Sequence, residues 1–577
     1  MKTENFVLRH YGRYKPHIIA IAALSLVSTL CSLFIPSLMK NIVDKGVANG
    51  DFGKILSSCV AMLALAAVSL CSAILSAKLA ARLSSAVSTD IRNDMFRKVN
   101  SLTFEEFASI GTSSLLTRAT EDVFVLQDAG AYFASSVCVP LLLIGGIAAS
   151  FFADVALALV LVCVLPVVCF IIFLLVRKMG KLWEKSDKYC DAQNKIVRER
   201  LYGIRVIRAF DKEDYEHARI TCATDNMAHN LVKSNLLSGL ITPICSCLLS
   251  LATVALVCVG YYRATVTSVI GAGDVIAVVQ YVALISNALL TTFWVLAFIP
   301  HVKVCGRRVN EVLALKGYAP VKTPPVIRSG DLKLENVTFR YPDGKLDSLE
   351  NVTAVFPQGK TIGVIGGTGS GKSTLIKLLL KFYPVTRGEI TLGGESYENL
   401  SGEDVRASVS CAMQKSMIFE GTLRDNVKIA NETATDAEVT AAINDACLKE
   451  FVDGLDDGLD YALSQSGANL SGGQKQRVNI ARAILKKASV YIFDDSFSAL
   501  DLLTEKTVRT RLDERLKGKT RIIVTQRVSS ARRCDLIYVF DNGRIVGEGD
   551  HAHLMSDCPT YREIYRSQTG EDDDETA

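Results

Sequence analysis

"TIGVIGGTGSGKSTLIKLLL", residues 361–380, is a short apolar run followed by a glycine-rich stretch and an amphipathic continuation. This order predicts a buried β-strand, a loop and the first turns of a helix. From Gly366 to Ser373 the residues match G-x-x-x-x-G-K-[ST], in the context that gives such a match its meaning. The glycines let backbone N–H groups close around phosphate oxygens, and the N-terminus of the helix favours negative charge. The stretch therefore predicts an α/β domain of the P-loop nucleotide-hydrolysing type.

The residues of this loop have distinct expected roles. The ammonium group of Lys372 would neutralise the β- and γ-phosphates of a nucleotide, and the hydroxyl of Ser373 would be a ligand of Mg²⁺. ATP and Mg²⁺ are therefore the expected cofactors. The cofactor-binding residues expected in the loop are Gly366, Gly367, Thr368, Gly369, Ser370, Gly371, Lys372, Ser373 and Thr374.

A second candidate phosphate loop lies further along the chain. In "NLSGGQKQRVNIARAIL", residues 469–485, Ser471, Gly472 and Gly473 stand where a helix is expected to begin. That helix leads to an apolar run ending in Asp494, as in a buried strand that presents a carboxylate to a metal-bound phosphate. One domain does not need two phosphate loops. A head-to-tail pair of domains does, if the second loop of each closes over the nucleotide of the other.

The first half of the chain is much more apolar than the second. The chain has 577 residues, about twice the size at which single hydrophobic cores stop growing, and its mean hydropathy is +0.26. Six windows carry no formal charge: 16–39, 55–77, 129–153, 155–176, 234–262 and 275–302. Each exceeds the ~20 residues with which a helix crosses a bilayer. The sequence therefore predicts an α-helical membrane domain of six spans before the nucleotide-binding domain.

Lysine and arginine set the expected orientation of these spans. They are abundant before the first span and in the connections 78–128 and 177–233, and sparse in the other connections. Cations concentrate on the cytoplasmic side, so we expect both termini and the nucleotide-binding domain to be cytoplasmic. Segment 181–212 has few helix breakers and is expected to project as a helix. Its apolar tip, residues 202–210, favours docking onto a partner surface over a solvated hairpin.

The overall composition argues against several other classes of protein. The 64 lysines and arginines nearly balance the 60 aspartates and glutamates, and no basic stripe with interleaved aromatic residues suggests nucleic-acid binding. The 16 cysteines are scattered, many of them within apolar runs, without the spacing of a zinc site or a disulfide framework.

The order of five motifs resembles the ATP-binding cassette (ABC) transporters. These motifs are GGTGSGKST, Gln414 in "CAMQKSMIF", LSGGQ, YIFDD and SALD. Together with the six preceding windows, they make essentially the whole chain resemble an exporter half-transporter, with one membrane domain fused to one nucleotide-binding domain.

The resemblance implies roles for further residues. Tyr341 would stack on adenine, Gln414 would contact Mg²⁺ and couple to the membrane domain, and Asp494 would hold Mg²⁺ through water. The signature residues Ser471, Gly472, Gly473 and Gln474, together with Asp501, would act across a dimer. Thr112–Leu116 and Gly203–Phe210 would be the two coupling helices. The residues expected to take part in catalysis are Lys372, Gln414, Asp495 and Gln526.

Three positions depart from the family pattern. One is Gln465, which stands where a glutamate is common. Asp495 stands where the family usually has a catalytic glutamate, and Gln526 stands where it usually has a histidine. A carboxylate that is one methylene shorter retracts by ~1.5 Å, and a misplacement of ~1 Å can cost ~100-fold in rate. Glutamine cannot shuttle a proton as histidine can. The chain therefore resembles the degenerate-site subunit of bacterial heterodimeric multidrug exporters, and its expected partner is a half-transporter with both residues intact. A slow homodimer is the alternative.

The expected domains are a transmembrane domain at 1–315, a linker at 316–331, an ABC nucleotide-binding domain at 332–568 and an acidic disordered tail at 569–577. The expected cargo is an amphipathic or hydrophobic compound moved across the plasma (inner) membrane. Flipping of a lipid or lipopeptide, and an ATP-gated regulatory or channel subunit, are alternatives. Gln280, Asn287 and Thr291 share one face of the sixth span, facing either a cavity or, with greater weight, a neighbouring helix.

Overall fold

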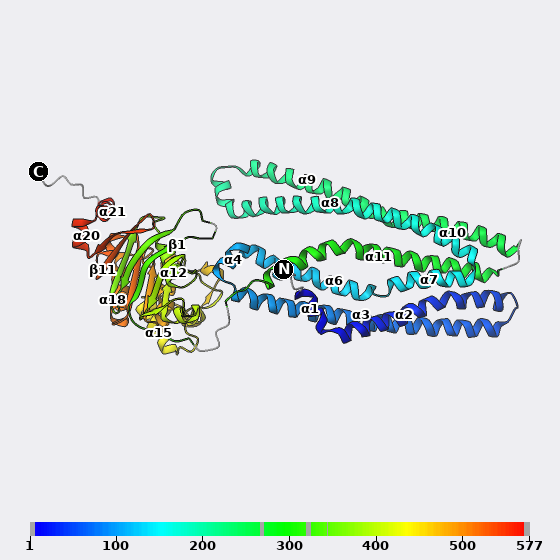
Figure 1. Ribbon diagram of the computed structural model, residues 1–577, viewed down its shortest axis with the longest axis horizontal. Coiled ribbons are helices and arrows are strands. Elements are labelled where there is room, and N and C mark those ends of the chain that lie inside the picture. Colours follow the sequence, from blue (N-terminus) through cyan, green and yellow to red (C-terminus); the bar gives the residue numbers. More distant parts are fainter. Residues whose placement is uncertain (1–5, 266–269, 319–324, 343, 570–577) are drawn as a thin grey trace. The chain divides into compact units, whose positions relative to one another are not determined.

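The computed structural model describes residues 6–265, 270–318, 325–342 and 344–569, which form two units. Unit 1 comprises Met1–Ser101 and Ile110–Lys316, and unit 2 comprises Leu102–Ser109 and Gly317–Ala577. In the described residues, unit 1 is helical and unit 2 combines helices with sheets (Figure 1). The expected fold class is confirmed.

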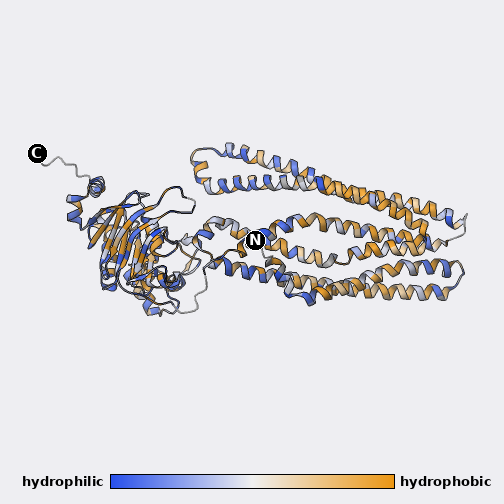
Figure 2. Ribbon diagram, viewed as in Figure 1, coloured by the Kyte–Doolittle hydropathy of each residue, from blue (hydrophilic) through white to orange (hydrophobic). Residues whose placement is uncertain are grey.

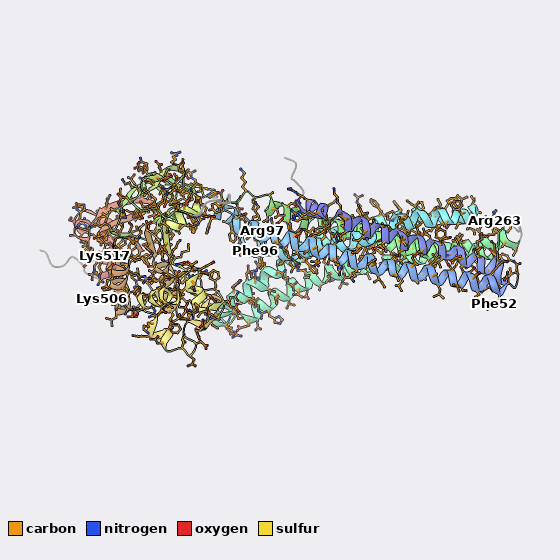
Figure 3. The ribbon with its side chains drawn as sticks, turned by 90° about the horizontal axis from the view of Figure 1, so that it is seen from below. Phe52, Phe96, Arg97, Arg263, Lys506 and Lys517 are labelled. Carbon is orange, nitrogen blue, oxygen red and sulfur yellow. The ribbon has the colours of Figure 1, made fainter. Side chains whose placement is uncertain are left out.

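Unit 1 is built from long apolar helices (Figure 2). Its α-helices are α1 (Phe6–Arg13), α2 (Lys15–Asn41), α3 (Phe52–Ser101), α5 (Thr112–Thr117), α6 (Val123–Ser136), α7 (Val139–Ala153), α8 (Val155–Ala209), α9 (Glu213–Gly239), α10 (Ile241–Thr265) and α11 (Ala272–Leu313). Two π-helical turns, η1 (Ile42–Val47) and η2 (Arg118–Asp122), lie at the end of α2 and before α6. Phe52 and Phe96 mark how far α3 extends along the unit (Figure 3).

Five helical segments in the described part of the chain are long and apolar enough to cross a membrane. They cover five of the six expected windows. The remaining window, 129–153, is divided between α6 and the shorter apolar helix α7. Pro140 stands in the first turn of α7, where its missing N–H group is tolerated, and its ring would clash within a continuous helix. Pro140 therefore explains why window 129–153 is divided into two helices.

The expected cytoplasmic projection is a helical hairpin. α8 runs without a break from Val155 to Ala209, and α9 begins at Glu213 after a short turn. The helix predicted for segment 181–212 is thus confirmed up to Ala209. Phe210 lies in the turn and has 71% of its surface exposed.

Asp154 explains the tight turn between α7 and α8. One carboxylate oxygen, Oδ1, accepts hydrogen bonds from the backbone N–H groups of Ala156 and Leu157 at 2.9 and 3.0 Å, which caps α8. The other oxygen, Oδ2, pairs with Arg263 of α10 at 2.7 Å, at the same end of the unit as Phe52 (Figure 3). Asp154 therefore caps α8 at the turn that follows α7 and links this turn to α10 by an ion pair.

The described residues of unit 2 form three sheets. The six-stranded sheet has the order β12-β11-β3-β10-β9-β6, parallel except for β12, and the four-stranded sheet has the order β2-β1-β4-β5. A two-stranded sheet pairs β7 (Gly421–Thr422) with β8 (Ala462–Leu463). The other strands are β1 (Leu332–Phe339), β2 (Leu349–Phe356), β3 (Thr361–Gly366), β4 (Arg387–Leu392), β5 (Glu395–Ser396), β6 (Val409–Ala412), β9 (Val490–Asp494), β10 (Thr520–Thr525), β11 (Leu536–Asp541) and β12 (Arg544–Gly549).

The helices of unit 2 cover these sheets and include the first predicted phosphate-binding helix. They are α4 (Phe104–Ile110), α12 (Lys372–Leu379), α13 (Gly402–Ser408), α14 (Leu423–Lys428), α15 (Asp436–Asp445), α16 (Lys449–Asp453), α17 (Gly472–Leu485), α18 (Leu502–Arg515), α19 (Val528–Ala531), α20 (His551–Asp557) and α21 (Pro559–Thr569). β3 is buried along its whole length. β10 pairs with β3 on one side and with β9 on the other, and both pairings are parallel. Their carboxyl ends meet at one edge, where ligands bind in open α/β sheets.

One segment from the membrane half of the sequence belongs to unit 2. The ring of Phe104 in α4 stacks on Phe382 with centroids 4.1 Å apart, and both carboxylate oxygens of Glu106 lie 3.2 Å from the backbone N of Gly317. The resemblance had pointed to Thr112–Leu116 as the first coupling segment. In the structure Leu102–Ser109 groups with unit 2, and α5, which includes Thr112–Leu116, lies in unit 1. The coupling role of Thr112–Leu116 and the domain bounds expected from the sequence stay predictions.

Candidate nucleotide-binding site

A cavity of about 570 Å³ lies at the carboxyl edge of β3, β9 and β10. Segments that are distant in sequence form its wall, among them the loop between β3 and α12, the end of β9 and the end of β10. Of the predicted site residues, it brings together Thr368, Gly369, Ser370, Gly371, Lys372, Ser373, Thr374, Gln414, Asp494, Asp495 and Gln526. All of the predicted catalytic and metal-binding residues therefore line one cavity.

The glycine loop needs its glycines at specific points. A Cβ atom on Gly366 would lie 2.2 Å from the carbonyl oxygen of Phe540, so only glycine fits where β3 ends. Gly369 and Gly371 have φ values of +83° and +105°, which L-residues with side chains rarely adopt. Gly371 directly precedes α12, so the loop aims the N-terminus of this helix at the cavity. The free N–H groups of a helix N-terminus bind anions well.

Lys372 is buried beside this loop with only neutral oxygen partners. Its Nζ donates to the carbonyl oxygens of Gly366 and Gly367 at 2.8 and 2.6 Å, and to the Ser370 hydroxyl at 3.1 Å. Burial lowers the pKa of Lys372, and the carboxylates of Asp494 and Asp495 partly oppose that shift. A buried cation without an ion pair is stabilised by an incoming anion, so Lys372 fits the phosphates of a nucleotide.

Asp494 fits a divalent cation. It is the last residue of β9, and burial raises the pKa of its carboxyl group to about 6, against the opposing effects of the Gln414 backbone and Lys372. Binding of a cation would favour the charged form. Ser373 and Gln414 line the same cavity, and such oxygen donors together with phosphate oxygens suit Mg²⁺. In the described residues, no group of three His, Cys, Asp or Glu side chains forms a metal site by itself.

Asp495 stands on the same cavity wall, at a backbone position of unusual geometry. Its φ is +45°, in the left-handed region that aspartate and asparagine tolerate better than most residues. Its backbone carbonyl accepts hydrogen bonds from the Ser498 hydroxyl at 2.8 Å and from Gln476 Nε2 at 3.4 Å. Burial raises the pKa of the Asp495 carboxyl group, while Ser498, Arg527 and Lys372 act against this shift.

Gln526 lies directly after β10 and also lines the cavity. Its backbone carbonyl accepts a hydrogen bond from the Gln568 side chain at 2.7 Å. Two of the three departures from the ABC pattern, Asp495 and Gln526, therefore lie in one cavity, with the phosphate loop and Asp494.

Comparisons with known proteins agree with this geometry. A family model described as the ABC transporter transmembrane region matches residues 18–289, and one described as ABC transporter matches residues 349–498. An uncharacterized ABC transporter ATP-binding protein of Mycobacterium tuberculosis is 33% identical over 572 residues, covering 97% of each chain. The chain belongs to the ABC transporter family.

Two further similarities refine this assignment. A bacterial Atm1-family ABC exporter with ATP bound has the same fold, with a TM-score of 0.83 over 96% of this chain and 99% of the other, at 22% identity. An ATP-dependent lipid A-core flippase of Aliivibrio fischeri is 29% identical over 575 residues, covering 97% of each chain. With one transmembrane region and one ATP-binding domain, this ABC transporter chain has the domain content of a half-transporter and the fold of an ABC exporter, and it is an integral membrane protein.

Tyr341 of the ABC domain does not line the cavity wall. Its hydroxyl group lies 3.2 Å from the Thr374 hydroxyl, and Lys377 Nζ lies 5.0 Å from the centre of its ring. The ring also meets Phe339 and Tyr383 edge-on, with centroids 4.9 and 5.4 Å away. Its contact with Thr374 places it beside the α12 end of the cavity. Stacking of adenine on this ring stays a prediction.

The signature residues of the ABC domain lie outside the cavity of their own chain. Ser471 is the N-cap of α17: its hydroxyl accepts from the Gln474 backbone N at 3.2 Å, and the Gln474 side chain accepts from the Ser471 N at 2.7 Å. Gly472 and Gly473 form the first turn of this helix. Asp501 caps α18 through the backbone N of Thr504 at 2.9 Å. None of these five residues lines the cavity.

Sequence reasoning missed part of the cavity wall. The missed residues are Leu346, Asp347, Ser348, Val524, Thr525, Asn542 and Gly543. Asn542 and Gly543, both with positive φ, form the turn between β11 and β12. Asn-Gly between apolar runs is a strong hairpin signal, so the turn was open to prediction. Its place at the cavity was not, because it depends on β11 pairing with β3.

Proposed function

We propose that this chain is one half of an ATP-driven exporter that moves amphipathic or hydrophobic compounds out of the cytoplasm. Its own nucleotide site binds ATP and Mg²⁺ but hydrolyses ATP weakly. Its signature residues complete the site of a second half-transporter that retains the catalytic glutamate and the histidine.

The observation that carries this proposal is the shared cavity of Asp495 and Gln526. Both substitutions act on chemistry, because a general base must reach the attacking water and a switch residue must meet the transferring phosphate. The residues that bind phosphate and metal, Lys372, Ser373 and Asp494, remain in place beside them. Two changes confined to hydrolysis in an otherwise intact binding site support a division of labour between two sites.

The intact signature loop supports the second part of the proposal. Ser471, Gly472 and Gly473 form a regular capped helix N-terminus that does not line this chain's own cavity. Such a terminus binds phosphate only if another nucleotide is brought to it, and a second ABC domain in head-to-tail arrangement would do so. The same logic assigns Asp501, which caps α18, to the dimer contact.

The membrane part of the proposal rests on the distribution of charge and of polar groups. Lysines and arginines in the connections 78–128 and 177–233 support cytoplasmic termini and a cytoplasmic nucleotide-binding domain in the plasma (inner) membrane. On α11, Asn287 is exposed within its chain, and Gln280 and Thr291 are half-buried. This favours a face toward a cavity or a second subunit over packing within the chain. The apolar surroundings suit an amphipathic cargo.

Flipping of a lipid is the second candidate function. The similarity to a lipid A-core flippase over nearly the full chain favours it, and the same ATP chemistry would drive it. Transport assays that compare a fluorescent phospholipid with an amphipathic dye in one vesicle preparation separate the two cargoes.

ATP hydrolysis by the chain purified alone tests the division of labour. We expect the chain to bind ATP with Mg²⁺ and to show little turnover until the partner half-transporter is added. Robust turnover by the chain alone, abolished by Lys372→Ala, would establish a working homodimer and contradict the proposal. An ATP-gated regulatory subunit is distinguished by the absence of transport against a gradient.

A further inference from the structure

The last described helix of the chain holds the segment that carries Gln526. The side-chain amide of Gln568 in α21 donates from Nε2 to the carbonyl oxygen of Gln526 at 2.7 Å. Its Oε1 accepts from the backbone N–H of Val528 at 2.8 Å. We propose that Gln568 is a positioning residue of the nucleotide site, which fixes the backbone on both sides of Arg527 and so sets where Gln526 stands on the cavity wall.

The first reason is that this segment has no cap of its own. Val528 is the first residue of α19, and the N-cap residue Arg527 makes no side-chain capping bond. The N–H groups at a helix start have no partner within the helix, so another group must satisfy them. Gln568 supplies that acceptor from forty residues away along the chain. The contact therefore does for α19 what a local serine or aspartate does for other helices.

The second reason is that the held segment connects two walls of the cavity. The guanidinium of Arg527 donates to the backbone carbonyl of Ser498 at 2.9 Å, and the Ser498 hydroxyl donates to the carbonyl of Asp495. A shift of residues 526–528 would thus move Gln526 directly and reach Asp495 through Arg527. Gln568 itself does not line the cavity, so it acts through these residues.

The third reason is that α21 is firmly anchored where it presents Gln568. Tyr561 in this helix has no exposed surface, and its hydroxyl lies 2.9 Å from His551 Nδ1. Tyr565 packs against the buried core of unit 2. The neighbouring Ser567 is exposed, as Gln568 is, but its hydroxyl donates to the Ile564 carbonyl of its own helix. Ser567→Ala is therefore a matched control that leaves the contact intact.

Hydrogen exchange on the full chain without nucleotide tests the contact itself. In Gln568→Ala we expect the amides of residues 526–530 to exchange about five-fold faster, as follows from losing one net hydrogen bond. Gln568→Glu keeps the acceptor for Val528 but loses the donor to Gln526, so it should give an intermediate rate. Ser567→Ala should match the unaltered chain. Unchanged exchange in Gln568→Ala, or an equal rise in β9, would overturn the proposal.

Binding of fluorescent MANT-ATP and MANT-ADP tests the positioning role, which rests on the proposed nucleotide-binding function. Gln526 lines the cavity and, in the proposed function, meets the terminal phosphate. Gln568→Ala should therefore weaken MANT-ATP binding by roughly three- to ten-fold and MANT-ADP binding less. Equal affinities in the variant and the unaltered chain, despite faster exchange, would overturn that role. If the unaltered chain binds neither nucleotide, the proposed function fails while the exchange experiment still decides the contact.

Discussion

The backbone N–H of Asp495 donates to the carbonyl oxygen of Val524 at 2.8 Å, immediately beyond the last residue of β9. This bond continues the pairing of β9 with β10 by one residue while the chain already turns, with φ of +45° at Asp495. The position where the family usually has its general base is thus held by backbone geometry and not by contacts of the side chain alone. A substitution at residue 495 changes both the reach of the side chain and the fit to this turn.

Asp495→Asn should fold as well as the unaltered chain and cost the exporter little activity. Asparagine tolerates positive φ at least as well as aspartate, and in the proposed scheme this carboxylate is already out of reach. Asp495→Glu restores the length of the side chain but fits the turn at positive φ less well. It should raise ATP turnover at this site only partly, because Gln526 remains. Thermal midpoints and steady-state ATP hydrolysis of the assembled pair measure both effects. Loss of all activity in Asp495→Asn would identify Asp495 as the working base.

Asp494 should give the protein a distinctive dependence on pH. Because burial raises the pKa of its carboxyl group to about 6, from 3.8 in the unfolded chain, the folded state binds more protons between these values. The contribution of this group to the free energy of unfolding therefore falls as pH rises from about 4 to about 6. Mg²⁺ needs the ionised form, so Mg²⁺-dependent nucleotide binding should strengthen over the same range.

Asp494→Asn tests both halves of this prediction in one variant. Without nucleotide, it should raise the thermal midpoint at pH 7.5 by ~2 °C or more, because a neutral amide replaces a buried charge. With nucleotide, it should lose the part of binding that depends on Mg²⁺. Asp541→Asn, which changes an exposed carboxylate at the end of β11, is the control and should do neither. A lowered midpoint in Asp494→Asn would show that the carboxylate stabilises the fold.

Phe104 and Phe210 should separate packing within this chain from docking on a partner. Phe104→Ala removes a ring stacked on Phe382 and should destabilise unit 2 by ~0.5–1.5 kcal/mol beyond the lost buried area. Phe210 is exposed in its own chain, so Phe210→Ala should leave the thermal midpoint unchanged and reduce transport of an amphipathic dye. Tyr215→Ala, at another exposed aromatic residue of the hairpin, is the control. Normal transport in Phe210→Ala would indicate a tip that contacts only water.

The sequence predicted most of the residues that line the cavity because they lie in short continuous motifs. The loop from Gly366 to Ser373 is a continuous stretch, and Asp494 and Asp495 end one apolar run, so spacing alone placed them. The membrane windows followed from hydropathy in the same way. The interruption at Pro140 is marked in the sequence by the proline itself and not by hydropathy.

What the sequence did not predict depends on contacts between distant segments. Phe104 joins unit 2 only because Phe382 meets it after nearly three hundred intervening residues, and no local pattern in 102–109 marks this. In the sequence nothing distinguishes Gln568 from an ordinary surface residue of a helix. Only the structure shows that its side-chain amide hydrogen-bonds to the backbone of Gln526 and Val528. Which residues make such contacts is decided by the folded arrangement of distant segments and not by periodicity along the chain.

Ser471→Ala should lower ATP turnover by the assembled exporter by ~10-fold or more, because in the proposed scheme it removes a hydroxyl that closes over the partner's nucleotide. The same change also removes the N-cap of α17, which by itself costs about 1 kcal/mol. Ser401→Ala removes a cap of the same kind from α13, a helix whose residues do not line the cavity. Both variants should lower the thermal midpoint by similar amounts, and only Ser471→Ala should silence hydrolysis. Steady-state assays with the changes in this chain alone decide the matter: equal losses of activity would show that Ser471 matters only as a helix cap.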